Sequence, residues 1–264
     1  METSRATRIA LFVYGLAALV FLLLPLVSVG FASISEARYL SFPIPRYSFQ
    51  WYAEALASST VRDLFVTSLK IAIIVTIVSV VVGFFGALAF ARYEWRYRKT
   101  FQKVILLPIF FPQAVLGLAL LIWFYTLGIL PNWKTAVVAH VVWISPITTL
   151  IIAIRAYSFD ASLEEAARDM GASTWTVMRE VTIPLLLPGI VTGALFAFLL
   201  SWGNFPLSLF TMGADASLPK WLYARMISGY SPLVPTLGVL SVFGSIAMLL
   251  IGLSVLWLTR RVIR

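Results

Sequence analysis

Six long apolar stretches constrain this chain more than any other feature. They cover residues 9–31, 64–91, 104–130, 135–154, 186–210 and 233–258. Each reaches the roughly 20 residues that a helix needs to cross the hydrocarbon core of a bilayer. Hydrophobic residues make up 61% of the 264 residues and charged residues 12%, whereas soluble domains use about 45–50% apolar residues. The sequence therefore predicts an all-α membrane protein with six transmembrane helices.

The first apolar stretch follows Arg5 and Arg8, as the apolar region of a signal peptide would. It is longer than the 7–15 residues of such a region, and no small-residue cleavage site stands out after it. We therefore expect a retained anchor and external segment in residues 1–60. Residues 61–264 would form a core domain with the other five spans.

The basic residues predict the orientation of the spans. The net charge of +9 does not indicate nucleic-acid binding, because Lys and Arg cluster at the ends of the apolar stretches. Basic residues favour cytoplasmic loops, so we expect both termini to be cytoplasmic and residues 32–63 to lie outside. The richer side would hold Arg5, Arg8, Arg92, Arg96, Arg98, Lys99, Lys103, Arg155, Arg168, Arg179, Arg260, Arg261 and Arg264, and the poorer side Arg38, Arg46, Arg62, Lys134, Lys220 and Arg225.

The sequence predicts neither a catalytic nor a metal site. The chain has no cysteine, which excludes disulfides and thiol chemistry. Its single histidine, His140, has no obvious acidic companion, and we expect it to be a packed, hydrogen-bonded residue. No Gly-x4-Gly-Lys-Ser/Thr loop is present, so the chain is expected to bind no nucleotide itself.

Residues 155–184 leave the apolar pattern and carry most of the functional signal. Ser162, followed three residues later by Glu165, fits a capping box with Ser162 as the N-cap of a helix. Gly171 would end that helix, because glycine tolerates the left-handed conformation at its C-terminus. Four apolar residues at helical spacing are expected to form one stripe along this helix: Leu163, Ala166, Ala167 and Met170. Three charged residues are expected to lie off the stripe: Glu164, Arg168 and Asp169.

A second short helix is expected after Gly171. Ser173 or Thr174 can cap it, Pro184 would end it, and Trp175, Met178 and Val181 would share one side. We call residues 162–184 the elbow. The residues alone leave two interpretations open: a structural element at the membrane surface, or a surface that docks a partner.

The elbow resembles a known motif. Glu165-Ala166-Ala167, three residues, Gly171, nine residues and then Val181-Thr182-Ile183-Pro184 is similar to the EAA motif of ABC importer permeases. Val181 and Ile183 stand where that family has Ile and Leu. The resemblance to the type I importer permease fold covers about 200 residues, from 61 to 258.

This resemblance implies a coupling helix seated in a cytoplasmic ATPase subunit. Glu165 would reach a basic residue of that subunit, and Gly171 would allow the turn. The residues assigned to ATPase coupling are Glu164, Glu165, Ala166, Ala167, Arg168, Asp169, Gly171 and Pro184. The implied partners are a dimer of ATPase subunits that binds ATP and Mg, a second and paralogous permease, and an extracytoplasmic substrate-binding protein. The implied location is the bacterial inner membrane.

Within that family, the chain is most similar to the second permease of spermidine/putrescine-type systems. The similarity rests on residues 88–93 and 161–167, and more loosely on 218–223. Polyamine permeases of this kind tend to have aspartates where this chain has residues 201–205, and no acidic residue lies in any predicted span. A polycation in a low dielectric favours opposing charge, so opines, amino-acid derivatives, phosphonates and iron remain open as substrates.

Polar residues within the spans are the candidates for the substrate path. They are Gln113, Ser201, Trp202 and Asn204. A buried amide seeks hydrogen bonds, and either a substrate or a neighbouring helix can supply them. Pro108 and Pro112 predict a bend in the third span. Four glycines, Gly83, Gly86, Gly189 and Gly193, are expected to allow close helix approach.

Two other classes of membrane protein were weighed against this interpretation. A secondary transporter driven by an ion gradient usually carries acidic residues within the membrane and internal repeats, and we find neither. A membrane-embedded enzyme needs convergent His, Asp, Glu or Ser/Lys groups near one membrane face. His140 has no such companions, so the enzyme is the weakest alternative.

Overall fold

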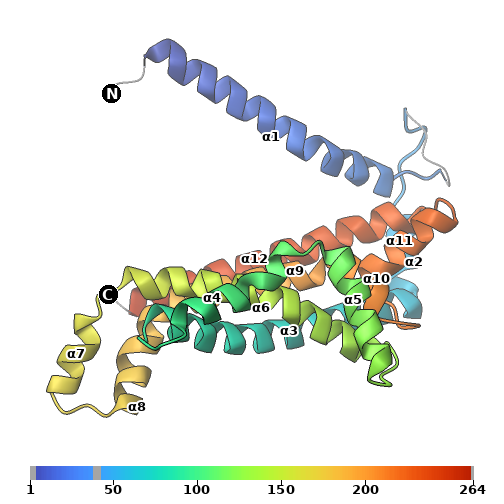
Figure 1. The fold of residues 1–264 in the computed structure, drawn as a ribbon. Coiled ribbons are helices and arrows are strands. Elements are labelled where there is room, and N and C mark those ends of the chain that lie inside the picture. The colour runs from blue at the N-terminus through green and yellow to red at the C-terminus, as the bar shows by residue number, and fades with distance from the viewer. Residues whose placement is uncertain (1–3, 38–42, 263–264) are drawn as a thin grey trace. The chain divides into compact units, whose positions relative to one another are not determined.

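The computed structural model describes residues 4–37 and 43–262, with side chains up to residue 258. Arg38 and Arg264 of the charge argument lie outside these residues, as do the side chains of Arg260 and Arg261. Between turns and loops, the described part is helical, and it has one isolated bridge between Ser35 and Tyr47. Its helices (Figure 1) are α1 Arg5–Ser33, α2 Gln50–Ala57, α3 Ser59–Ala91, α4 Arg98–Leu106, η1 Leu107–Phe110, α5 Gln113–Thr126, α6 Trp133–Ser158, α7 Ser162–Asp169, α8 Thr174–Val177, η2 Met178–Thr182, α9 Ile183–Trp202, α10 Pro206–Thr211, α11 Leu218–Ser228 and α12 Leu233–Val262.

The predicted spans are confirmed in number but not all in form. Within the described residues, five helices are long and apolar enough to cross a membrane, or six if one bent pair counts as a span. The bent pair is the third predicted span, in which Arg98–Phe110 and Gln113–Thr126 meet at 103°. Phe111 between them is extended (φ −84°, ψ 133°), because a residue before proline disfavours the helical conformation. The two prolines therefore break this span.

The fifth predicted span has different limits in the structure. The sequence predicted a helix over residues 186–210, whereas the helix runs from Thr174 to Trp202. It ends at Gly203, and Pro206 begins the separate short helix α10. Proline is well suited to the first turn of a helix, where its missing N–H is not needed. The apolar run in the sequence thus continues past the end of the helix, and hydropathy alone does not reveal that end.

The chain divides into two compact units, residues 1–62 with 222–244 and residues 63–221 with 245–264. In the first unit, the hydroxyls of Ser33 and Tyr52 lie 2.8 Å apart, and the Thr236 hydroxyl donates to the Ser33 carbonyl over 3.4 Å. These contacts tie the end of α1 to α2 and α12. The domain boundary expected at residue 60 stays a prediction.

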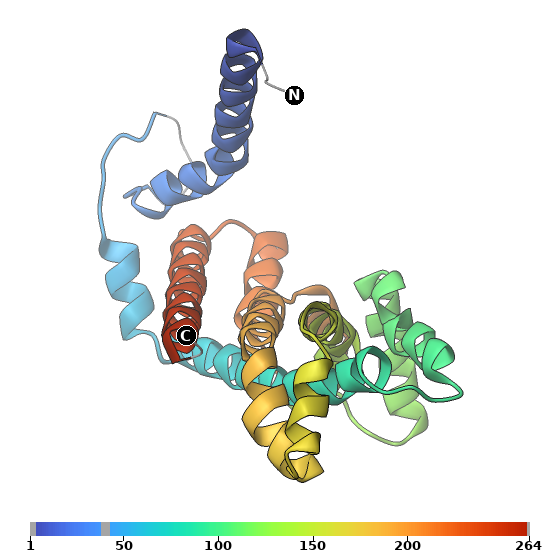
Figure 2. The same cartoon turned by 90° about the vertical axis from the view of Figure 1, so that its left-hand side faces the viewer.

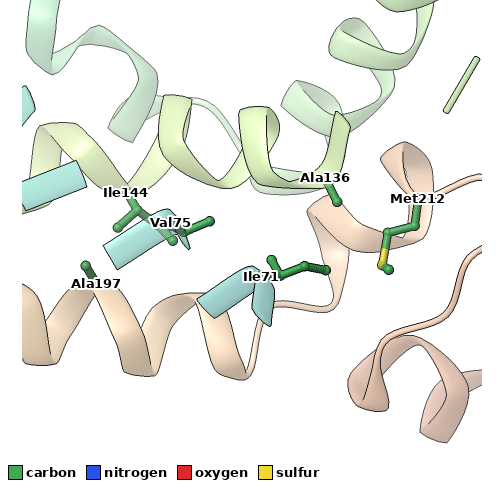
Figure 3. Packing of buried hydrophobic residues seen from close by; sticks show 6 residues of the cluster. All are labelled: Ile71, Val75, Ala136, Ile144, Ala197 and Met212. Carbon is green, nitrogen blue, oxygen red and sulfur yellow. The ribbon is translucent and has the colours of Figure 1, made fainter. Parts of the chain in front are cut away.

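The second unit is built around α6, which packs against both α3 and α9. Figure 3 shows part of their shared core, with Ile71 and Val75 from α3, Ile144 from α6 and Ala197 from α9. All four side chains are buried. The elbow connects α6 to α9, and the end of α3 contacts it.

Glycines bring α3 and α9 into close contact with α6. A methyl group at Gly83 would lie 3.0 Å from Thr148 Cγ2, and one at Gly193 would lie 3.1 Å from the same atom. A methyl group at Gly189 would come within 2.8 Å of Arg155 Cβ, and one at Gly86 within 3.0 Å of Thr149 Cγ2. The expectation of close helix approach at these glycines is confirmed.

Candidate functional site

The elbow is a hairpin of two short helices at the junction of α6 and α9. Gly171 between them has a φ of +85°, a backbone conformation that residues other than glycine rarely adopt. Ser173 is the N-cap of α8, and its hydroxyl accepts a hydrogen bond from the Thr176 N–H over 3.2 Å. Figures 1 and 2 show α7 and α8 projecting together from the same end of α6 and α9. The predicted helix–glycine–helix form is confirmed.

The predicted capping box at the start of α7 is wrong. Ser162 is the first helical residue, and the N-cap is Ala161, which makes no side-chain capping bond. The Ser162 N–H donates instead to the Asp160 carboxylate over 3.0 Å. This backbone hydrogen bond holds the pKa of Asp160 below its ordinary value. Aspartate readily bonds the backbone two residues on, so Asp160 replaces Ser162 in this role and leaves Glu165 free of it.

Pro184 does not end the second elbow helix, as the sequence predicted. The helix continues through it, and a wider π turn, Met178–Thr182, precedes it. There the Ile183 N–H bonds to the Met178 carbonyl five residues earlier. A proline ring normally clashes with the carbonyl four residues before it. The π turn accommodates that proline, so the elbow and the membrane span α9 are one continuous helix.

The elbow exposes three large apolar side chains. Leu163 is 48% exposed, Met170 83% and Trp175 71%, whereas Ala167 is buried against the rest of the chain. The stripe expected from the sequence is thus divided, with Ala167 facing inward. Glu165, Ala166, Arg168 and Asp169 are exposed beside it. Exposed large apolar side chains on a polar segment favour contact with another protein.

Glu164 differs from the other charged residues of the elbow. The sequence placed it on the charged rim, whereas the structure places it between α7 and the end of α3. Its carboxylate accepts a hydrogen bond from Arg92 over 2.7 Å and another from the Thr182 hydroxyl over 2.5 Å. The exposed fractions of the Arg92 and Glu164 side chains are only 10% and 13%. Sequence reasoning could not find this contact, because Arg92 is distant along the chain.

A second group of polar residues lies at the ends of α6 and α9 that are opposite the elbow. His140 is buried, with Nδ1 2.9 Å from the Ser201 hydroxyl and Nε2 3.0 Å from the Ser208 hydroxyl. The expectation that His140 is a hydrogen-bonded packing residue is confirmed. Asn204, also buried, donates to the Gln113 side-chain oxygen over 3.2 Å and accepts from the Leu207 N–H over 3.1 Å. We call these five side chains, Gln113, His140, Ser201, Asn204 and Ser208, the polar cluster.

The structure brings the residues expected at the substrate path close together. Three of them belong to the polar cluster, and the fourth, Trp202, is 7% exposed and stacks with Phe198 at 6.0 Å between ring centroids. The hydrogen bonds of the cluster join α5, α6, α9 and α10, which is the alternative role that the sequence left open. Direct contact with a substrate stays a prediction. Ser208 is the member that sequence reasoning missed, since a serine among apolar residues gives no distinct signal.

Comparison with known sequences identifies several similar permeases. The model of the family described as "Binding-protein-dependent transport system inner membrane component" matches residues 79–264. The spermidine/putrescine transport system permease protein PotC of Haemophilus influenzae is 28% identical over 234 residues, or 88% of this chain and 90% of that protein. The putrescine transport system permease protein PotI of Escherichia coli is 29% identical over 202 residues, or 74% of this chain and 72% of that protein. The molybdenum transport system permease protein ModB of Escherichia coli is 29% identical over 173 residues, or 59% of this chain and 76% of that protein.

Solved structures share the fold. A chain of a bacterial ABC transporter that imports the polysaccharide alginate superposes with a TM-score of 0.64 at 23% identity, over 95% of this chain and 98% of that chain. A chain of the MetNI methionine ABC transporter gives 0.64 at 21% identity, over 76% of this chain and 99% of that chain. The expected fold of an ABC importer permease is therefore confirmed.

The family model covers well over half of the chain. Its description implies an ATPase, a binding protein and a partner permease, and a non-catalytic role in the membrane for this subunit. The chain belongs to the binding-protein-dependent transport system inner membrane components, the multi-pass permeases of bacterial ABC importers.

Proposed function

We propose that the elbow is the docking surface for a cytoplasmic ATPase subunit. The observation that carries this proposal is that Leu163, Met170 and Trp175 are exposed on the segment that also contains the motif residues Glu165 and Gly171. Because the elbow continues into α9 without a break, a displacement of the docked elbow would be transmitted to that membrane span. ATP and Mg would bind the ATPase subunits and not this chain.

The distribution of basic residues supports an orientation with the elbow in the cytoplasm. Arg92, Arg155 and Arg168 accompany the elbow or the ends of the helices beside it. Positive residues favour the cytoplasmic side, so both chain termini would lie there too. The loops at the other end would then receive the binding protein, and a second, paralogous permease would complete the path.

We further propose a polyamine as the solute that is carried. The similarity to a spermidine/putrescine permease, which extends over 88% of this chain, supports this choice. The six apolar stretches predicted as spans supply uncharged polar groups, as in the polar cluster, and contain no acidic residue. Recognition of the positive charge would therefore fall mainly to the binding protein and to the partner permease.

The test is uptake by the complete complex in vesicles. The chain is coexpressed with its ATPase, partner permease and binding protein, purified, and reconstituted with ATP on the elbow side. We expect the ATPase subunit to copurify and labelled spermidine to accumulate only with ATP. Uptake by this chain alone, or uptake that follows an imposed ion gradient without ATP, would contradict the transport mechanism. Uptake of molybdate in place of spermidine would contradict only the choice of solute.

A further inference from the structure

A buried ion pair joins the elbow to a helix with which it has no direct chain connection. Arg92 follows the last turn of α3, and Glu164 lies in the first turn of α7. Their side chains meet at 2.7 Å and are almost fully enclosed. The Thr182 hydroxyl, at the end of the π turn, donates to the second oxygen of the Glu164 carboxylate. One carboxylate thus contacts the end of α3 and the beginning of α9.

Arg92 also holds the segment that leads from α6 into the elbow. Its guanidinium lies over the Phe159 ring, 4.0 Å from the ring centroid, and donates to the Phe159 carbonyl over 3.5 Å. Phe159 directly follows the end of α6. Guanidinium groups combine such ring contacts with charge-assisted hydrogen bonds in fixed geometry. A single arginine at the end of α3 therefore contacts the chain on the α6 side of the elbow as well as the elbow itself.

The chain itself links the elbow to two spans only. A short segment connects α7 to α6, and α8 runs directly into α9. The helix α3 belongs to the same packed core, with Gly83 against Thr148 of α6, but no covalent link of comparable length joins it to the elbow. At the elbow end, Leu88 of α3 packs with Ala156 of α6 and Leu186 of α9, whereas the ion pair of Arg92 joins the end of α3 to α7 itself.

We propose that Arg92 and Glu164 are positioning residues that transmit movement of the elbow to α3. This inference rests on the proposed docking of an ATPase to the elbow and deepens it. With the pair intact, α3, α6 and α9 move together when the elbow is displaced. Without it, the elbow still docks, but its displacement reaches α3 only indirectly, through the packing of α3 against α6 and α9. The pair would then decide how much transport each ATP drives, and not how tightly the ATPase binds.

The experiment measures uptake per ATP hydrolysed by the complete complex in vesicles. We expect Glu164→Gln and Arg92→Gln to keep the copurifying ATPase subunit and its hydrolysis, while uptake per ATP falls by about tenfold, within the range typical of coupling between sites. The exchange of charges, Arg92→Glu with Glu164→Arg, should recover part of the ratio. The matched control is Glu94→Gln, which removes the exposed partner of Arg98 nearby and should leave the ratio unchanged.

A reversible cross-link separates a mechanical role from a purely stabilising one. The natural chain has no cysteine, so Arg92→Cys with Glu164→Cys introduces the sole thiols of this subunit. A short bis-thiosulfonate linker between the two thiols should restore uptake per ATP. A reducing agent, which releases the linker, should lower uptake per ATP again. An unchanged ratio in both single variants, or in the linked and the reduced protein, would overturn the inference. If the wild-type complex failed to retain its ATPase, the proposed function itself would be wrong.

Discussion

The elbow and the polar cluster lie at opposite ends of α6 and α9, and each contains residues whose polarity differs from their surroundings. At about 1.5 Å per residue, the segment of α6 from His140 to Ser158 spans roughly 27 Å, close to the thickness of a bilayer core. At one end, Leu163, Met170 and Trp175 expose apolar surface on a polar segment. At the other, His140 and Asn204 bury polar groups in an apolar bundle.

The two regions differ in whether the chain itself supplies partners for these residues. Each polar group named in the cluster has a hydrogen-bond partner within the chain, whereas Leu163, Met170 and Trp175 of the elbow stay exposed in the described structure. Buried polar groups with partners hold helices in place, and uncovered apolar groups favour association. The comparison therefore supports the proposal that the elbow serves assembly and that the polar cluster supports the bundle. Changes at the elbow should alter coupling, and changes at the cluster should alter stability.

The largest effect is expected from Gly171→Val. Its φ of +85° costs a residue with a side chain about 1–2 kcal/mol, and a β-branched one more, so the hairpin would open. We expect the ATPase subunit to be lost on purification and uptake to fall by at least about tenfold, the change that 1.4 kcal/mol corresponds to. The measurement is the amount of copurifying ATPase together with uptake.

A glycine in the loop between α5 and α6 provides the control for that variant. Gly128 also has a positive φ, +71°, and at both positions an added methyl group would meet nothing within 4 Å. Gly128→Val thus imposes a similar backbone cost away from the elbow. It should retain the ATPase. Equal loss of the ATPase in both variants would show that general destabilisation, and not the elbow, explains the result.

A smaller and different effect is expected from His140→Leu. The substitution leaves the hydroxyls of Ser201 and Ser208 without their shared partner and should destabilise the bundle by about 1–2 kcal/mol. Thermal unfolding of the purified complex would show this, whereas uptake per ATP should stay at the wild-type value. Ser254→Ala is the control, because that exposed hydroxyl bonds only within its own helix. A changed uptake ratio at unchanged stability would contradict the supporting role.

The sequence predicts much of the difference between the elbow and the polar cluster, but only where residues close together in the sequence determine the structure. Apolar runs of span length identify the membrane helices, and the need for a left-handed residue identifies the turn at Gly171. The start of α7 is harder, because Asp160 and Ser162 are both good capping residues and compete for the same backbone groups. Pro184 is ambiguous for a similar reason: a proline ends a helix unless the turn before it widens.

Long-range pairs lie beyond what one sequence reveals. Arg92 with Glu164, and His140 with Ser208, are joined by tertiary packing and not by any spacing in the chain. The third span shows the same limit, since Pro108 and Pro112 predict a bend but not the 103° break that results. The angle depends on which neighbours satisfy the freed backbone groups.

A still smaller effect is expected from removing the hydrogen bond between Asn204 and Gln113. Single and double alanine variants form a cycle whose interaction energy should be about 0.6 kcal/mol, the average for hydrogen bonds between membrane helices. The measurement is the stability of the purified complex for all four proteins. The substrate concentration at half-maximal uptake should not move. A shift of that concentration without a loss of stability would instead support direct substrate contact by these two amides.

The smallest effect is expected at Asp160, which is fully exposed and begins α7. Asp160→Ala removes the acceptor of the Ser162 N–H, so hydrogen exchange at the start of α7 should quicken by roughly twofold to threefold, as expected for weakening one exposed cap. Asp160→Asn keeps an acceptor and is the control.

The pKa of Asp160 is lowered in the folded chain, so its charge stabilises α7 at pH values above the unfolded pKa, which is near 3.9. This stabilisation is lost as the pH falls through the lower pKa of the folded chain. The alanine variant should therefore differ from the natural chain at neutral pH and converge with it in strong acid. Equal exchange at neutral pH would show that the elbow begins without this cap and is held in place by the Arg92 contacts instead.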